Sequence, residues 1–190
     1  YKNTKVDAQM LKDADVDAVI LAIGSSPITI KLEGMDKLQH ASAPEVLRHE
    51  VCPKGKVAVI GGGLVGLETA DTLATDGCDV TVLEMKDEIG SDLGSLRKIA
   101  VMMKLQQMQV KMLPNSKVCK FTEEGIVLED ETLVPCNCAV FAVGFASNDS
   151  HLLVEECEKR QIPCRVIGDA KSARRALDAI AEGFEAARTL

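Results

Sequence analysis

Apolar and polar residues follow one another along the chain in two rhythms, which predict alternating strands and helices. Short, nearly unbroken apolar runs are typical of buried strands, whereas apolar residues three or four positions apart indicate helices. The predicted strands cover residues 16–23, 56–60, 79–84, 138–143 and 165–167. The predicted helices cover residues 44–49, 64–75, 95–109 and 174–189. This order favours an α/β fold, a parallel sheet with helices on both of its faces.

A period of two between residues 110 and 135 breaks this pattern. It predicts a small antiparallel β-meander, with strands at 117–121, 126–129 and 132–134. In the predicted helix 95–109, apolar residues recur at helical spacing and are expected to face the core. These inward positions are Leu96, Ile99, Met103 and Met108.

Composition and charge exclude several classes of partner. Hydrophobic residues make up 46% and charged residues 27% of the chain, a balance that permits a packed core. The net charge is −7, Trp is absent and no basic patch stands out, so we expect binding neither to nucleic acid nor to a membrane surface. The longest apolar run, residues 139–146, is far shorter than the roughly 18 residues of a membrane span.

Seven cysteines without a regular spacing indicate free thiols in a reducing compartment, and we expect a cytoplasmic location. Cys136 and Cys138 are two positions apart, which favours two half-buried side chains of one strand. A metal site that drew on these two thiols, Cys164 and His151 would need a convergence that the sequence does not show. No metal ligand is therefore predicted.

The sharpest motif is Gly-x-Gly-x-x-Gly at Gly61, Gly63 and Gly66, between a predicted strand and a predicted helix. Such a turn lets the backbone leave the strand sharply, approach a pyrophosphate and pack the helix against the strand. The free amides at the helix start then face the phosphates. Glu84, 23 residues after Gly61, ends the next strand. There a carboxylate can accept both hydroxyls of an adenine ribose and would repel a 2′-phosphate, which favours NAD over NADP.

The segments 61–70 and 80–85 together resemble the NAD domain of two-dinucleotide flavoprotein reductases, the FAD/NAD-linked pyridine nucleotide-disulfide oxidoreductase superfamily. Segments 83–90, 167–169 and 178–187 are similar to the C-terminal region of one group within it. That group is the old-yellow-enzyme-like 2,4-dienoyl-CoA reductases, or NADH:flavin oxidoreductases. The resemblance implies a Rossmann-like fold and the cofactors NAD(H) and FAD.

The resemblance also implies a division of the chain. Residues 1–53 would be part of an incomplete FAD-type domain, residues 54–150 an inserted NAD(H)-binding domain, and residues 151–190 a return to the FAD-type domain. The sequence holds no second Gly-x-Gly-x-x-Gly, no barrel and no cysteine cluster for an iron–sulfur centre. We therefore expect this chain to be a fragment of an enzyme. Its partner would be the missing N-terminal portion of the same enzyme, which would contain FAD or FMN. An iron–sulfur cluster, like FMN, would belong to that portion.

The resemblance assigns further site residues. Glu68 would lie near the nicotinamide carboxamide, Asp169 near the ribityl or diphosphate region of the flavin, and Gly144 at the end of the NAD-side strand. No catalytic acid or base is predicted. The cofactor-binding residues predicted in all are Gly61, Gly62, Gly63, Leu64, Val65, Gly66, Glu68, Glu84, Met85, Gly144 and Asp169.

The implied function is to bind the small nucleotide NADH and to deliver its hydride to a flavin. The chain would do so within a larger oxidoreductase that reduces an enoate, a dienoyl-CoA or a flavin. The isolated chain is expected to be inactive. Two other interpretations stay open: a dinucleotide-binding module for interaction or regulation, and FAD instead of NAD in the glycine-rich site. Association into a homo-oligomer through exposed apolar surface also stays open.

Overall fold

The computed structural model describes residues 1–190, which form two compact units. The central unit is Pro27–Gly144, and the terminal unit combines Tyr1–Ser26 with Phe145–Leu190. The central unit thus begins well before the predicted residue 54, because residues 39–42 pair with the strand at 138–141. It also ends before the predicted residue 150.

The central unit is built on a parallel sheet of five strands in the order β3-β10-β4-β5-β6. In the register of the three middle strands, Val59 lies beside Val140 on one side and Val82 on the other. All carboxyl ends therefore meet at one edge of the sheet. The strands are β3 (Gln39–Ser42), β4 (Lys56–Ile60), β5 (Asp79–Leu83), β6 (Lys111–Leu113) and β10 (Cys138–Phe141).

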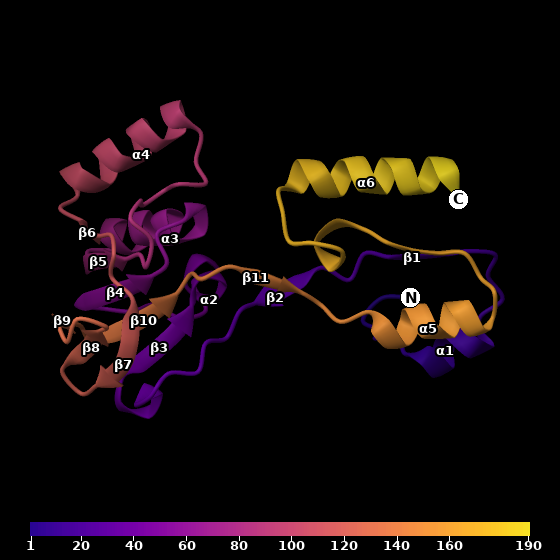
Figure 1. Ribbon diagram of the computed structural model, residues 1–190, viewed down its shortest axis with the longest axis horizontal. Coiled ribbons are helices and arrows are strands. Elements are labelled where there is room, and N and C mark those ends of the chain that lie inside the picture. Colours follow the sequence, from indigo (N-terminus) through magenta and orange to yellow (C-terminus); the bar gives the residue numbers. More distant parts are fainter. The chain divides into compact units, whose positions relative to one another are not determined.

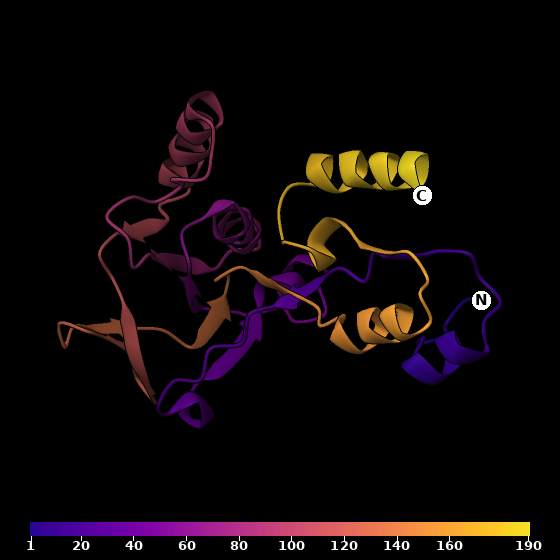
Figure 2. The same cartoon turned by 45° about the vertical axis from the view of Figure 1, so that its right-hand side comes forward.

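Three helices pack on one face of this sheet and an antiparallel meander packs on the other (Figures 1 and 2). Val59 of β4 faces the helices, where it joins the buried Leu67 of α3. Its neighbour Ile60 faces the meander, where it joins Phe121 and Ile126. The helices are α2 (Ala43–Leu47), α3 (Leu64–Thr75) and α4 (Ser95–Gln107), and the meander strands are β7 (Val118–Thr122), β8 (Gly125–Leu128) and β9 (Leu133–Pro135).

This arrangement confirms the predicted α/β class, with its parallel sheet and its meander. The helices, however, cover one face rather than both. The meander occupies the second face and buries Phe121, Ile126 and Val134 against it. A short 3-10 helix, η1 (Met35–Lys37), precedes β3.

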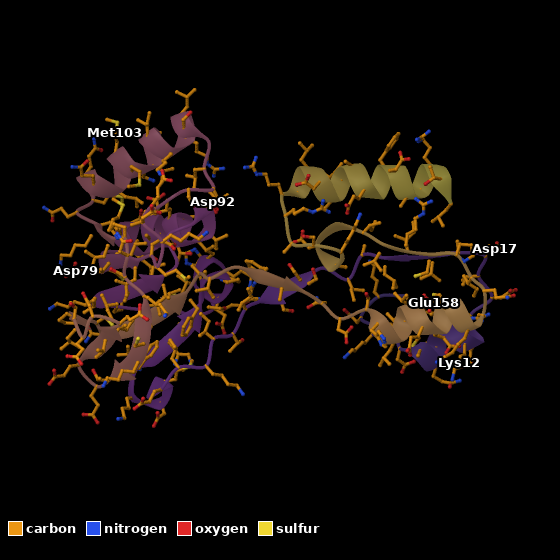
Figure 3. All side chains as sticks on the ribbon, in the orientation of Figure 1. Lys12, Asp17, Asp79, Asp92, Met103 and Glu158 are labelled. Atoms are coloured by element: carbon orange, nitrogen blue, oxygen red, sulfur yellow. The ribbon has the colours of Figure 1, made fainter.

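The predicted inward face of α4 is wrong for three of its four residues. Leu96, Ile99 and Met103 are 84%, 57% and 58% exposed, and Met103 is marked on α4 in Figure 3. The core side instead carries the fully buried Leu105, with Met108 partly buried beside it. The helix has apolar residues on two opposite faces, so helical spacing alone could not tell which face is buried.

The terminal unit contains short strands and three helices. β1 (Val19–Leu21) pairs in parallel with β12 (Cys164–Val166), so the predicted strands in these regions exist but are shorter or shifted by a residue. On α6, Leu177, Ile180 and Phe184 are at least 69% exposed. The remaining elements are α1 (Ala8–Asp13), β2 (Ser25–Pro27), β11 (Phe145–Ser147), α5 (His151–Lys159), η2 (Gly168–Ala170) and α6 (Ala176–Thr189). No helix of the structure is both long and apolar enough to cross a membrane.

Candidate functional site

The glycine motif forms the turn between β4 and α3 at the carboxyl edge of the sheet. Gly61 has φ +110°, and a Cβ there would lie 2.5 Å from the carbonyl oxygen of Ala142. A Cβ on Gly66 would lie 1.9 Å from the carbonyl oxygen of Gly61. Neither position has room for a side chain, because backbone approaches it directly. The motif thus places the start of α3 close against the end of β4.

The first turn of α3 receives its negative charge from another segment. Gly63 is the N-cap residue and has no side chain, and the first turn of the helix holds no acidic residue. Asp92, which is labelled in Figure 3, lies in the connection between β5 and α4. Its carboxylate accepts from the backbone N–H of Leu64 at 3.1 Å (Oδ1) and 3.0 Å (Oδ2). Its carboxylate therefore satisfies an amide that the helix itself leaves without a partner.

Glu84 follows β5 directly and is fixed beside the glycine turn. Its Oε2 accepts from the backbone N–H of Gly62 at 2.7 Å, and its Oε1 accepts from that of Lys86 at 2.9 Å. The residue is only 9% exposed. Two backbone donors thus hold the carboxylate in one orientation, and each oxygen keeps a lone pair for a further donor.

A cavity of about 510 Å³ runs along this edge of the sheet. Besides residues of the turn, it is lined by Ser116 and Lys117 after β6 and by Ile30 and Leu32 before η1. Lys117 is ion-paired with Glu129 at 2.6 Å, and this hydrogen bond raises the pKa of the lysine. The predicted site residues that line the cavity are Gly61, Gly63, Leu64, Val65, Glu84, Met85 and Gly144.

Four predicted site residues do not line this cavity. Gly62 and Gly66 support the turn, one through the bond to Glu84 and the other through close packing. Glu68 is exposed on α3 and forms an ion pair with Arg97 of α4 at 2.8 Å. Asp169 belongs to the terminal unit.

Within the terminal unit, the turn that carries Asp169 is held by charges. Asp169 accepts from Ser25 Oγ at 3.1 Å and from the backbone N–H of Arg174 at 3.2 Å. The Glu182 carboxylate accepts from the Arg174 guanidinium at 2.5 Å and from the Gly168 N–H at 2.7 Å. These two bonds, with a weaker one from Lys171, lower the pKa of Glu182 to about 2.

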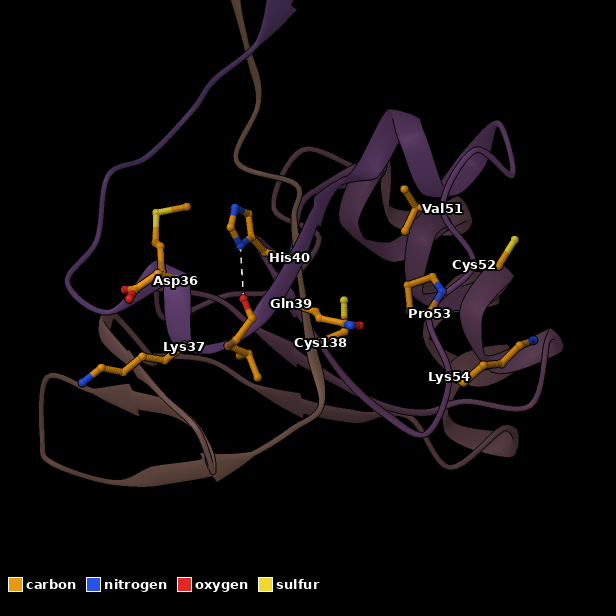
Figure 4. A pocket seen from close by; sticks show the side chains of 11 residues that line it. Asp36, Lys37, Gln39, His40, Val51, Cys52, Pro53, Lys54 and Cys138 are labelled. Atoms are coloured by element: carbon orange, nitrogen blue, oxygen red, sulfur yellow. Dashed lines mark hydrogen bonds between the residues drawn. The ribbon is translucent and has the colours of Figure 1, made fainter.

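A second hollow, of about 680 Å³, lies elsewhere on the central unit (Figure 4). It is lined by Gln39 and Cys138, the first residues of β3 and β10, together with His40 and Cys52. His40 Nδ1 lies 3.2 Å from the backbone oxygen of Leu38, the contact drawn in Figure 4. This hollow is thus at the amino ends of parallel strands, whereas ligands of open α/β sheets bind at the carboxyl ends.

The prediction of two half-buried cysteines on one strand is wrong, because only one of them lies within a strand and both are buried. Cys138 is the first residue of β10, Cys136 lies between β9 and β10, and both are 5% exposed. Burial raises the pKa of each thiol to about 11, so both are protonated at neutral pH. No group of three or more His, Cys, Asp or Glu side chains has an arrangement that could hold a metal ion.

Sequence reasoning missed several residues that line this cavity. Ile30, Leu32, Ser116 and Lys117 reach the cavity through tertiary packing, and no local pattern marks them. Asp92 lies in an irregular connection, where acidic residues at 87, 88 and 92 look alike in the sequence. Only the fold shows which of the three reaches α3.

A parallel sheet with a Gly-x-Gly-x-x-Gly turn at its carboxyl edge defines an α/β protein of the Rossmann-like class. The chain belongs to the pyridine nucleotide-disulphide oxidoreductase family, whose sequence pattern matches residues 1–170. That family consists of oxidoreductases.

Individual comparisons agree with this assignment. The chain is 36% identical to a bilirubin reductase of Mediterraneibacter gnavus (strain CC55_001C), with 97% of this chain and 29% of that protein covered. It is 34% identical to a cinnamate reductase of Clostridium sporogenes, with 99% and 29% covered. Its fold is similar to that of a 2-naphthoyl-CoA reductase in complex with 2-naphthoyl-CoA, with a TM-score of 0.87, 24% identity and coverages of 99% and 29%. The chain thus spans less than a third of the length of these relatives.

Proposed function

We propose that the central unit binds NADH at the glycine turn and presents it to a flavin within a longer oxidoreductase. The observation that carries this proposal is the pairing of two features at one sheet edge. The turn has no room for side chains at Gly61 and Gly66, and the fixed carboxylate of Glu84 stands beside it at the cavity wall. Together they match the needs of a pyrophosphate and of an adenine ribose.

Each part of the dinucleotide has a group that would hold it. The pyrophosphate would approach the backbone at Gly63 and the first amides of α3, where a side chain would obstruct it. The ribose hydroxyls would donate to Glu84, whose charge repels the 2′-phosphate of NADPH. We therefore propose NADH rather than NADPH as the ligand.

The wider reaction is a further part of the proposal. NADH, when bound, supplies a hydride, and we assign its acceptor to a flavin held by the rest of the longer protein. The terminal unit, with Asp169 on its charged turn, would contribute to the FAD-type domain. The reductases of bilirubin and of cinnamate among the relatives support a reducible organic molecule as final substrate. The chain itself orients the nucleotide, and we assign no catalytic acid or base to it.

The test is calorimetric titration of the chain with NADH, NADPH and FAD, alongside two glycine variants. Gly63→Val places a side chain where the pyrophosphate would lie, and its nearest contact, Asp92 Oδ2 at 3.1 Å from Cβ, belongs to an exposed side chain that can move. Gly94→Val is the matched control, because Gly94 is also the N-cap of a helix and nothing lies within 4 Å of its Cβ.

We expect NADH to bind the parent chain and the Gly94→Val variant, NADPH to bind more weakly, and Gly63→Val to lose binding. If FAD binds and NADH does not, the ligand of the glycine turn is the flavin nucleotide and not NADH. If both glycine variants bind NADH with equal affinity, the glycine turn is not part of the NADH site.

A further inference from the structure

The connection between β5 and α4 folds back onto the glycine turn. The backbone N–H of Gly90 donates to the carbonyl oxygen of Gly62 at 2.7 Å. Ile89, next to it, is 6% exposed and packs into the core on the helical face of the sheet. These two contacts anchor the connection above the turn, and they place Asp92 within reach of α3.

The Asp92 carboxylate lies where an anion is most favoured. Both of its oxygens lie within 3.1 Å of the Leu64 amide nitrogen, and Oδ2 lies 3.1 Å from the Cβ position of Gly63. The first amides of a helix and its dipole attract negative charge. Asp92 also lines the cavity whose wall includes the glycine turn. An anionic group of the chain thus stands at the point that a bound pyrophosphate would need.

We propose that Asp92 is a built-in competing anion, which the pyrophosphate of a dinucleotide must displace, and that this residue sets the affinity of the site. The inference rests on the proposed function, because it concerns the same turn. Two anions cannot share the Leu64 amide, and their mutual repulsion opposes binding while Asp92 stays in place. The connection is anchored through the backbone of Gly90 and the side chain of Ile89, so the exposed Asp92 side chain can turn away without unfolding it.

The effect of Asp92 on affinity should depend on whether the ligand carries a phosphate group. A nucleotide that carries a pyrophosphate has to displace the carboxylate, whereas adenosine, which has no phosphate, does not reach it. Removal of the charge should therefore strengthen the binding of NADH and of ADP but leave that of adenosine unchanged. A residue with a merely structural role would not divide the ligands in this way.

The experiment titrates four forms of the 190-residue chain with NADH, ADP and adenosine by calorimetry: the parent, Asp92→Asn, Asp87→Asn and Asp92→Ala. The Asp92→Asn side chain keeps an oxygen for the Leu64 amide but carries no charge, so the capping contact and the fold are retained. Asp87→Asn is the matched control, since it removes the same charge from an exposed position of the same connection. Asp92→Ala is added because it removes both the charge and the cap.

We expect Asp92→Asn to bind NADH about two- to fivefold more tightly than the parent, the scale of one favourable charge at an exposed helix terminus. Asp87→Asn should match the parent. Asp92→Ala should melt at a lower temperature without ligand and gain more from NADH than the parent does. The inference is overturned if the parent and both Asn variants bind NADH equally, or if Asp92→Asn binds more weakly. If none of the forms binds NADH, both the proposed function and this inference are refuted.

Discussion

Helix α3 comes so close to the glycine turn that position 66 has no space for a side chain. A Cβ at Gly66 would lie 1.9 Å from the carbonyl oxygen of Gly61 and 2.9 Å from its carbonyl carbon. Both atoms belong to the backbone, so the contact can be relieved only if the helix or the turn moves. We therefore expect Gly66→Ala to destabilise the central unit.

The magnitude follows from two opposing effects. Forcing an extra group into a packed site costs about 1–3 kcal/mol, and a clash with backbone belongs at the upper end of that range. Ala favours a helix by about 1 kcal/mol relative to Gly. The net loss is then about 2 kcal/mol in the free energy of unfolding. For a chain of 190 residues, this corresponds to a melting temperature about 4–8 °C lower.

The assay is urea unfolding followed by far-ultraviolet circular dichroism, because the chain has no Trp for fluorescence. Gly183→Ala is the matched control, since Gly183 also lies inside a helix but its Cβ would meet only Ile167 Cδ1, at 4.0 Å. That variant should be more stable than the parent by up to about 1 kcal/mol. If Gly66→Ala is as stable as the parent, the approach of α3 to the turn does not restrict position 66.

Other parts of the chain are tested by smaller changes. Glu84→Ala removes the acceptor of the Gly62 amide and the proposed ribose contact, so NADH should bind about 1–2 kcal/mol more weakly in calorimetry; an unchanged Kd would contradict this. Because the pKa of Glu182 is lowered from 4.5 to about 2 in the folded chain, its stabilising effect is complete above pH 4.5 and is lost as the pH falls through 2. The melting temperatures of the parent and Glu182→Gln should therefore differ near neutral pH and converge at low pH, and a constant difference would refute the assignment. Burial raises the pKa of Cys138 to about 11, so iodoacetamide should modify it far more slowly than the exposed Cys119 at neutral pH, as peptide mass spectrometry would show; equal rates would mean that the thiol is accessible.

The sequence predicted the β4–α3–β5 unit well because its signals are local. The strand at 56–60 and the helix at 64–75 have the predicted bounds, since the glycines mark the turn and Gly77 follows the end of the helix. Glu84 could likewise be placed at a strand end from its distance to Gly61. Such features depend on neighbours in the sequence and not on the rest of the fold.

The features that the sequence did not predict depend on tertiary contacts. The strand β3 has the sequence Gln-His-Ala-Ser, which lacks an apolar run, and it exists because it pairs with β10 at the edge of the sheet. The buried face of α4 could not be chosen, because apolar residues lie on both sides of that helix. Asp92 reaches α3 only through the folding back of the connection at Gly90.

Binding of a nicotinamide dinucleotide at the glycine turn would change the surroundings of its backbone amides, which amide chemical shifts report. In an NADH titration of the isotopically labelled chain, the amide signals of Gly63 and Leu64 should shift most, while that of Gly183 in the terminal unit serves as the internal reference. We expect these shifts to saturate and to follow the affinity found by calorimetry. Binding of NADH that leaves the signals of Gly63 and Leu64 unmoved would contradict its placement at the glycine turn.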